Sequence, residues 1–266
     1  TPSWAWIPPI SPSRSRSGSG MRLSLSTEAA PDLALSDLLA ACARRGLVAL
    51  ELVEGHAHGV STESPPEVLA QVRGEVASEG GRIAAYRVDT LERATSPAAA
   101  ALAKGLGTSI VAPAGDDAAD DEILLRAAEL YAAAGATLLV AHGARPARVE
   151  RLRQIIEAAP EGVLGLAWDV DPEDDALATS IAAVLRAAGP HLKHVRLRGG
   201  GPEAAGQEGR GIGPLMARLT LAGYDGTLAL APSTPRYRFA WGAWLGRHGG
   251  WGCGSKRADA SLVTLD

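Results

Sequence analysis

The chain has 266 residues, of which 46% are hydrophobic and 21% are charged, and its net charge is -4. This length is ample for one large domain with a sizeable core. The acidic balance disfavours nucleic-acid binding, which needs a basic surface against the phosphates. Two cysteines, Cys42 and Cys253, are too few for a disulfide framework, so we expect a reducing, cytoplasmic setting. No apolar run approaches the roughly 20 residues that cross a bilayer, so no membrane association is expected.

The two ends of the chain differ in composition from its middle. Residues 1–20 are rich in Ser, Pro and Gly and lack the apolar stretch of a secretory signal, so we expect a disordered leader or an appended segment. The folded pattern begins at Met21, and we expect one domain over 21–256 and a tail over 257–266. Trp241 and Trp244 share a helical face, which predicts a last helix across the domain, with a lid or dimer contact as the alternative.

From Met21 onward, short apolar runs alternate with segments of helical period. The expected strands are 22–26, 47–52, 82–86, 109–112, 137–141, 163–168, 194–198 and 227–230. The expected helices are 36–45, 66–78, 97–104, 120–134, 146–158, 174–188 and 214–222. Proline in first turns and glycine after helix ends support these bounds. Near-continuous apolar strands that alternate with helices indicate a parallel sheet.

Eight such units favour closure into a (β/α)8 TIM barrel over an open doubly wound sheet. The first strand leads into SLSTEAAPD, at 24–32, which lacks the glycine-rich phosphate turn of a Rossmann sheet. Function in a barrel lies at the carboxyl ends of the strands. Charged and imidazole side chains follow those ends here, and the catalytic candidates among them are Glu51, His142, Asp169 and Arg196.

Each of these candidates has a chemical reason and an alternative. Asp169 stops the apolar run VLGLAW, and we favour a pocket role over a loop cap. A neutral His142 suits general acid or base work. Glu51 is also a candidate general acid or base. The alternative is a structural carboxylate that bonds the amides of the neighbouring loop. Arg196 is a permanent cation that stabilises an anion, or it forms a buried ion pair with Asp169.

The ligand-binding candidates lie in the loops and at one strand end. His56 and His58 form the pair in GHAHG, which contacts substrate, solvent or a metal. We expect only one of Arg196 and Arg198 to point into the barrel and favour Arg196, while His194 is expected to point outward. Glu203 and Arg210 lie in a glycine-rich loop that is either a sugar contact or a surface loop.

Several segments, in order, resemble the xylose isomerase-like barrels, which include sugar phosphate isomerases, epimerases and the endonuclease IV type. The segments are RGLVALELVEGHAHGV (45–60), GLGTSIVAPAG (105–115), LLVAHG (138–143), GLAWDVDP (165–172), HLKHVRLRG (191–199) and AGYDGTLAL (222–230). The resemblance covers about residues 21–232. It implies a xylose isomerase-like TIM barrel and, in the family's usual form, a divalent metal bound at the strand ends.

The resemblance also implies where that metal's ligands should stand. The strand-five Glu position falls on Val140, the strand-six Asp is present as Asp169, the strand-seven His position falls on Arg196, and the strand-eight Glu position falls on Ala231. Only Asp169 is retained, so we expect no tightly held divalent ion, although the resemblance leaves one open. Hard cations need several oxygen ligands, which this set lacks.

These observations predict a sugar or sugar-phosphate isomerase or epimerase that moves a proton next to a carbonyl without the usual metal site. The alternative is a non-catalytic barrel that binds a carbohydrate-like ligand or a protein partner. Metal-dependent phosphodiester cleavage fits poorly, because that chemistry needs many His and carboxylate ligands. We expect a small-molecule ligand and no nucleic acid or membrane partner, with homo-oligomerisation left open.

Overall fold

The computed structural model describes residues 20–43, 47, 49–114, 118–143, 145–171, 174, 177–198 and 212–231. Eight parallel strands follow one another around a closed barrel, and β8 pairs with β1 to complete it. The strands are β1 (Arg22–Ser26), β2 (Ala49–Val53), β3 (Arg82–Arg87), β4 (Ile110–Pro113), β5 (Leu138–His142), β6 (Leu164–Val170), β7 (Leu192–Arg198) and β8 (Thr227–Ala231). The predicted (β/α)8 TIM barrel is therefore confirmed.

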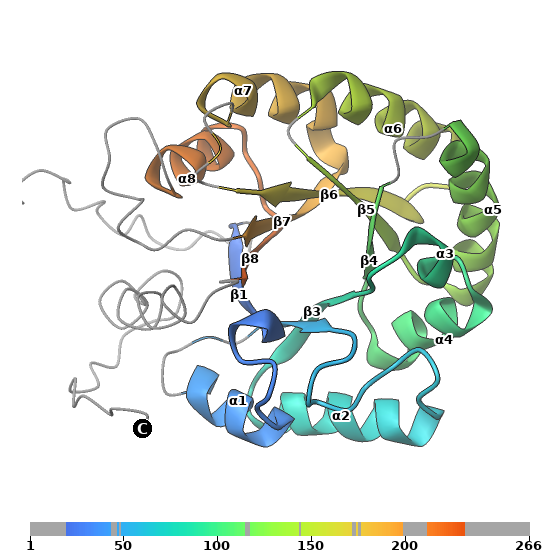
Figure 1. Cartoon of the computed structure of the whole chain (residues 1–266), viewed down its shortest axis with the longest axis vertical. Helices are drawn as coiled ribbons and strands as arrows, with labels where there is room; N and C mark the ends of the chain where they lie inside the picture. The colour runs from blue at the N-terminus through green and yellow to red at the C-terminus, as the bar shows by residue number, and fades with distance from the viewer. Residues whose placement is uncertain are drawn as a thin grey trace, which may run out of the picture.

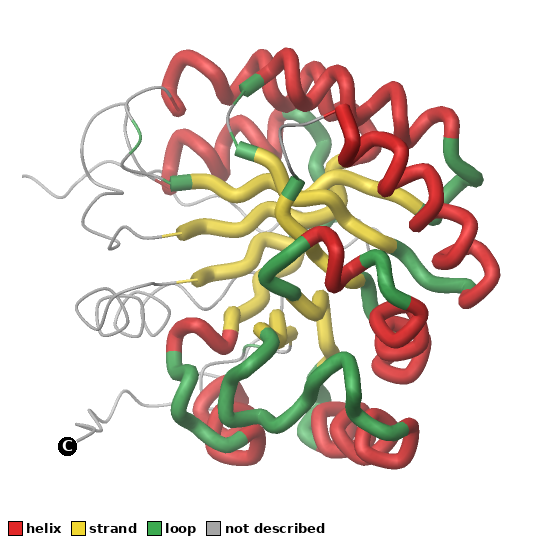
Figure 2. The backbone as a smooth tube through the Cα atoms, turned by 45° about the vertical axis from the view of Figure 1, so that its right-hand side comes forward, coloured by secondary structure: helices red, strands yellow, loops and turns green. Residues whose placement is uncertain are grey.

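Helices form an outer ring around these strands (Figure 1). They are α1 (Leu35–Ala43), α2 (Pro66–Ser78), α3 (Leu91–Ala94), α4 (Pro97–Leu106), α5 (Ala118–Ala134), α6 (Pro146–Ala158), α7 (Leu177–Ala188) and α8 (Ile212–Leu221). Two 3-10 turns, η1 (Thr27–Ala29) and η2 (Gly189–His191), complete the described elements. In Figure 2 the strands run together through the middle and the helices lie outside them. No helix in the described ranges is both long enough and apolar enough to cross a membrane.

Local sequence signals explain most of these bounds. Pro66 and Pro146 stand in the first turns of α2 and α6, where a missing N–H costs nothing. Gly107 ends α4 with φ 67°, in the left-handed region that a side chain disfavours. All eight strands lie where the sequence predicts them, within about two residues. The short α3 was not predicted, because four residues are too few for a periodic pattern. The leader, the tail and the predicted Trp241–Trp244 helix lie outside the described residues.

The strands separate two hydrophobic layers. The larger cluster joins helix residues to alternate strand positions such as Leu138, Val140, Trp168 and Leu230, so these side chains face outward to the helices. The intervening positions face the inside of the barrel, because successive side chains on a strand alternate between faces. A small inner cluster fills one half of that interior: Ala85, Val111, Leu139, Ala141 and Ala167, from β3 to β6.

Two β-bulges set which residues face inward. Between β2 and β3 the pairing passes from Leu50–Ile83 to Glu51–Ala85 and skips Ala84. Between β6 and β7 it passes from Leu166–Leu192 to Ala167–His194 and skips Lys193. A one-residue insertion changes the face that every later residue presents. The first bulge turns Arg87 into the barrel, and the second turns His194 and Arg196 inward.

Candidate active site

The other half of the barrel interior contains the buried charged groups. Glu51 on β2 is fully buried, and both of its carboxylate oxygens are engaged. Arg196 Nε donates to Glu51 Oε1 at 2.9 Å, and His194 Nε2 bonds Glu51 Oε2 at 2.6 Å. Arg196 and His194 are each only 1% exposed. Glu51 therefore holds two side chains of β7 across the barrel.

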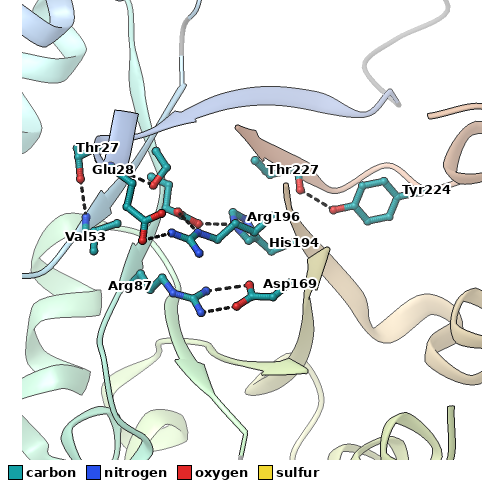
Figure 3. A network of polar contacts seen from close by, with 11 residues as sticks. Thr27, Glu28, Val53, Arg87, Asp169, His194, Arg196, Tyr224 and Thr227 are labelled. Carbon is teal, nitrogen blue, oxygen red and sulfur yellow. Dashed lines mark hydrogen bonds and ion pairs between the residues drawn. The ribbon is translucent and has the colours of Figure 1, made fainter. Parts of the chain in front are cut away.

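A second carboxylate approaches Arg196 from the end of β1. Ser26 Oγ accepts from the Glu28 backbone N–H at the start of η1. The turn projects Glu28 over the barrel, where its Oε1 lies 2.5 Å from Arg196 Nη2 (Figure 3). Thr27 Oγ1 accepts from the Val53 N–H at 2.9 Å and ties the turn to the end of β2. The Glu28 side chain is 30% exposed, so this pair lies between the buried network and solvent.

A separate ion pair, between Arg87 and Asp169, spans the barrel from β3 to β6. Arg87 Nη1 donates to Asp169 Oδ1 at 3.0 Å, and Nη2 donates to Oδ2 at 2.5 Å. The two side chains face each other in Figure 3. They are 12% and 16% exposed, so this pair is nearer to solvent than Glu51 and Arg196. Such two-point contacts are among the stronger charged hydrogen bonds in proteins.

The network fixes the charge of its members. Burial alone would raise the pKa of the Glu51 carboxyl, but Arg196 and His194 outweigh it and hold that pKa well below its usual range. Burial would lower the pKa of Arg196, but Glu51 and Glu28 raise it above its ordinary value. Glu51 is therefore a persistent anion and a weak proton acceptor.

The structure corrects the alternative interpretation of Arg196. That alternative paired Arg196 with Asp169, and the two are indeed register partners on neighbouring strands. Asp169 instead bonds Arg87 with both oxygens, while Arg196 donates a hydrogen bond to Glu51 and forms an ion pair with Glu28. The reason is geometric, because neighbouring strand residues point inward side by side, while residues across the barrel point toward each other.

The expected directions of His194 and Arg198 were also wrong. Residues two apart on a strand share a face, so His194, Arg196 and Arg198 all lie on the inner side of β7. His194 is buried against Glu51 and does not point outward. Arg198 is exposed because it is the last residue of the strand, at the barrel's mouth.

His142 lies at the expected end of the barrel but on the other side of the sheet. It follows Leu138 and Val140 at two-residue steps, and both of these pack against the helices. Its ring stacks on outward-facing Trp168 with centroids 6.3 Å apart. Burial lowers the pKa of His142, and Nδ1 bonds the Gly143 carbonyl at 2.6 Å. His142 is thus not brought together with Glu51, Asp169 and Arg196.

The two loop histidines make local contacts. His58 Nε2 bonds the Val53 carbonyl at 2.7 Å, and its Nδ1 accepts from the Val60 N–H at 3.1 Å. Both ring nitrogens therefore serve the loop backbone, in the neutral tautomer. His56 Nδ1 lies 2.8 Å from Thr27 Oγ1, beside the turn that carries Glu28. His56 thus lies nearer the barrel mouth's network than His58. Glu203 and Arg210 lie outside the described residues.

The residues present do not fit the divalent metal that the family resemblance implies. Among the described residues, no group of three His, Cys, Asp or Glu side chains is placed to hold a metal ion. Asp169 gives both oxygens to Arg87, and Glu51 gives both to Arg196 and His194. On β8 the inward Ala231 offers no donor. Hard cations need several free oxygen ligands, and these carboxylates already bond cations of the protein.

One of the carried-over ligand positions was placed on the wrong face. Val140 belongs to the outward-facing cluster, so a side chain there cannot reach the barrel's interior. The inward positions of β5 are Leu139 and Ala141, which are aliphatic too. No carboxylate therefore faces the barrel interior from β5. The reason is that its inward residues are aliphatic, and not that Val140 replaces a ligand.

Three members of the site were not among the sequence candidates. Arg87 and Glu28 follow the third and first strands in the sequence without a recognisable motif, and His194 was expected to point outward. Two bulges turn Arg87 and His194 toward the barrel interior. Assigning alternate residues to opposite faces from the start of each strand cannot reveal such bulges. For Glu28 the available signal was Ser26, a residue type that caps helical turns.

Comparisons with known proteins find solved structures with a similar barrel fold. No protein-family model matches the sequence, and no curated protein matches it either. Among solved structures, it is similar to 3-keto-D-glucoside 4-epimerase from E. coli, with a TM-score of 0.59, 14% identity, and coverage of 85% of this chain and 99% of that one. D-allulose 3-epimerase from Methylomonas sp. gives 0.59 and 14%, with 86% and 96% covered.

A xylose isomerase domain protein from Planctomyces limnophilus gives a TM-score of 0.59 at 15% identity, with 86% of this chain and 95% of that chain covered. At such low identity the likeness shows the fold alone. The chain thus has the xylose isomerase-like TIM-barrel fold, as its ordered motifs predicted.

Proposed function

We propose that this chain is a metal-independent barrel of the sugar isomerase and epimerase type, which binds a sugar at the carboxyl ends of the strands and moves a proton next to its carbonyl. The observation that carries the proposal is the pair of guanidinium groups, Arg87 and Arg196, held inside the barrel mouth by carboxylates. Structural neighbours named as sugar epimerases support the substrate class.

The proposed chemistry uses these fixed cations in place of a Lewis acid. Asp169 takes the proton from the carbon next to the carbonyl, and the electron pair of that C–H bond moves into an enediolate. Arg87 stabilises the developing oxygen charge, since a guanidinium remains charged in proteins. Return of the proton to the neighbouring carbon, together with passage of the hydroxyl proton from one enediolate oxygen to the other, gives the isomer. Its return to the opposite face of the same carbon gives the epimer.

The other members of the site hold this arrangement in place. Glu51 is a positioning residue, because its two oxygens orient Arg196 and His194. Glu28 and Arg198 lie at the more exposed rim, where sugar hydroxyls and, in a phosphorylated sugar, the phosphate would bind. His142 takes no part in the proposed proton transfer.

A second candidate is a non-catalytic barrel that binds a carbohydrate-like ligand. The complete pairing of Asp169 with Arg87 favours it, because a carboxylate that accepts two charged hydrogen bonds is a poorer base. The two candidates predict the same ligand class but different chemistry on it.

The test is proton exchange in D2O. Chelator-treated protein is incubated with ketoses, aldoses and their phosphates, and NMR follows the hydrogen next to the carbonyl. The proposal predicts deuterium incorporation that Asp169→Asn abolishes and that Glu79→Gln, at the exposed end of α2 near the amino end of the barrel, leaves unchanged. Binding without exchange in any sugar would establish the second candidate, and exchange that appears only after manganese is added would contradict metal independence.

A further inference from the structure

The opposite end of the barrel holds a cavity of about 440 Å³ that the proposed function does not use. Residues at the amino ends of the strands line it. Arg22 and Arg82 are the first residues of β1 and β3, and Thr137 directly precedes β5. This size is typical of small-molecule sites. The amino end of a TIM barrel ordinarily serves stability, so a polar cavity there calls for a separate explanation.

The charge of this cavity has one sign. Its cations are Arg22, Arg82 and Lys104, and no Asp or Glu belongs to its described lining. None of the three makes an ion pair within the part of the chain that the structure describes. The two arginines inside the barrel, Arg87 and Arg196, are by contrast each paired with a carboxylate. Three cations thus gather in this described lining without a carboxylate, in a chain whose net charge is -4.

Two of these cations, Arg22 and Arg82, also lie close enough for one charge to disfavour the other. Burial lowers the pKa of Arg82, and the positive charge of Arg22 lowers it further. Bringing like charges together around a partly enclosed space costs free energy, which a bound anion would recover. Thr108 and Ser109 also line this space, and each carries a hydroxyl that can donate a hydrogen bond to a ligand.

The helix ends nearby do not account for these cations. Lysine and arginine often lie near helix carboxyl ends to bond the last carbonyls. Here the carbonyls of Ala103 and Lys104 already accept from the Thr108 and Gly107 N–H groups, at 3.1 and 3.2 Å. At the end of α5, Ala136 N–H bonds the Tyr131 carbonyl at 3.0 Å. These backbone caps leave the cationic side chains available for a ligand.

We propose that this amino-end cavity binds a small phosphate-bearing anion, separately from the sugar site at the carboxyl end. Arg82 lies partly buried in the wall and supplies the planar donor pair that suits phosphate oxygens. Arg22 and Lys104 lie at the exposed rim, where they attract the anion. The volume leaves room for a group larger than a single phosphate.

The test titrates inorganic pyrophosphate into the full chain by calorimetry at fixed ionic strength. We expect one pyrophosphate per chain, and about tenfold weaker binding in Arg82→Gln, because one charged hydrogen-bond donor is lost. Arg218→Gln is the matched control, since it removes the same charge from the exposed face of α8 and should leave binding unchanged. Lys104→Gln, on the exposed rim, should weaken binding by a smaller factor and serves if Arg82→Gln fails to fold.

Three results would overturn the proposal. The first is no binding heat at millimolar pyrophosphate. The second is an equal loss in Arg82→Gln and Arg218→Gln, which would indicate nonspecific attraction. The third is binding that Arg87→Gln removes while Arg82→Gln retains it, which would place the anion at the carboxyl end. Deuterium exchange tests the sugar site, and pyrophosphate calorimetry tests the anion site. Either proposal can therefore fail without affecting the test of the other.

Discussion

The two halves of the barrel interior are filled by opposite kinds of side chain. From β3 to β6 the interior holds Ala85, Val111, Leu139, Ala141 and Ala167, which pack as a small apolar cluster. Across from them, β2 and β7 contribute Glu51, His194 and Arg196, which are equally buried but charged or polar. Dispersion contacts are each weak and local. Each member of a buried ion pair needs its partner. Substitutions in the charged half should therefore have strongly coupled effects on the free energy of unfolding, whereas those in the apolar half should have more local effects.

The largest effect is expected when the charged half loses its central cation. Arg196→Ala leaves Glu51 buried without its main counter-charge, which typically costs ~3–5 kcal/mol. Urea unfolding of the variant and the wild type measures this loss. An unchanged free energy of unfolding would show that the Glu51–Arg196 pair is not buried as described.

Two controls sharpen that result. Arg153→Ala removes an arginine from surface pairs with Glu150 and Glu157 on α6, and we expect little change. Replacing both Glu51 and Arg196 with methionine should recover much of the stability lost by Arg196→Ala, because no fully buried charge is left without a partner; Glu28, which also loses Arg196, is 30% exposed. If the double methionine variant loses as much stability as the two single methionine variants added together, Glu51 and Arg196 are not coupled.

In the apolar half, Leu139→Ala should cost roughly 2–4 kcal/mol by leaving a cavity. The structure offers a specific rescue, because a Cβ at Gly165 would lie 2.8 Å from Leu139 Cδ2. Gly165→Ala alone should therefore destabilise the protein, whereas together with Leu139→Ala it fills part of the vacated space. Unfolding free energies of the two single variants and the double variant test this, and strict additivity would count against the described packing.

The Arg87–Asp169 pair lies between these two halves and nearer to solvent. Arg87→Gln should cost only about 1–2 kcal/mol, because the remaining carboxylate regains water. We expect its effect on deuterium exchange to be the greater one, with exchange reduced by a factor of about 100 or more if Arg87 stabilises the enediolate. Stability and exchange are measured on the same preparation. A large loss of stability with exchange intact would make Arg87 a structural residue.

The smallest expected effect is a pH dependence from two buried histidines, one at the end of β5 and one in the loop after β2. Burial lowers the pKa values of His142 and His58, so folding favours their neutral forms. Their contribution is fully present above about pH 6.5, the unfolded value, and is lost as the pH falls below it. Urea midpoints at pH 7.5 and 5.5 should differ less in His142→Asn than in the wild type. An equal difference in both would remove His142 as a source.

The sequence predicts the barrel well because eight apolar strands and their helices repeat one strong pattern. It predicts the members of the site less well. Glu51, Asp169 and Arg196 were found because charge at the end of an apolar strand is conspicuous. Arg87 and His194 were missed because bulges that skip Ala84 and Lys193 decide which residues turn inward. The choice of partners depends on distance across the barrel, which no linear spacing contains.

Metal affinity tests the central claim most directly, namely that ion pairs hold the barrel mouth together in place of a divalent cation. Manganese is titrated by calorimetry into chelator-treated wild-type protein and into Asp169→Asn. With both oxygens of Asp169 bonded to Arg87 and both of Glu51 bonded to β7, we predict no saturable binding below millimolar manganese in either protein. Micromolar or tighter binding to the wild type that Asp169→Asn removes would contradict the account.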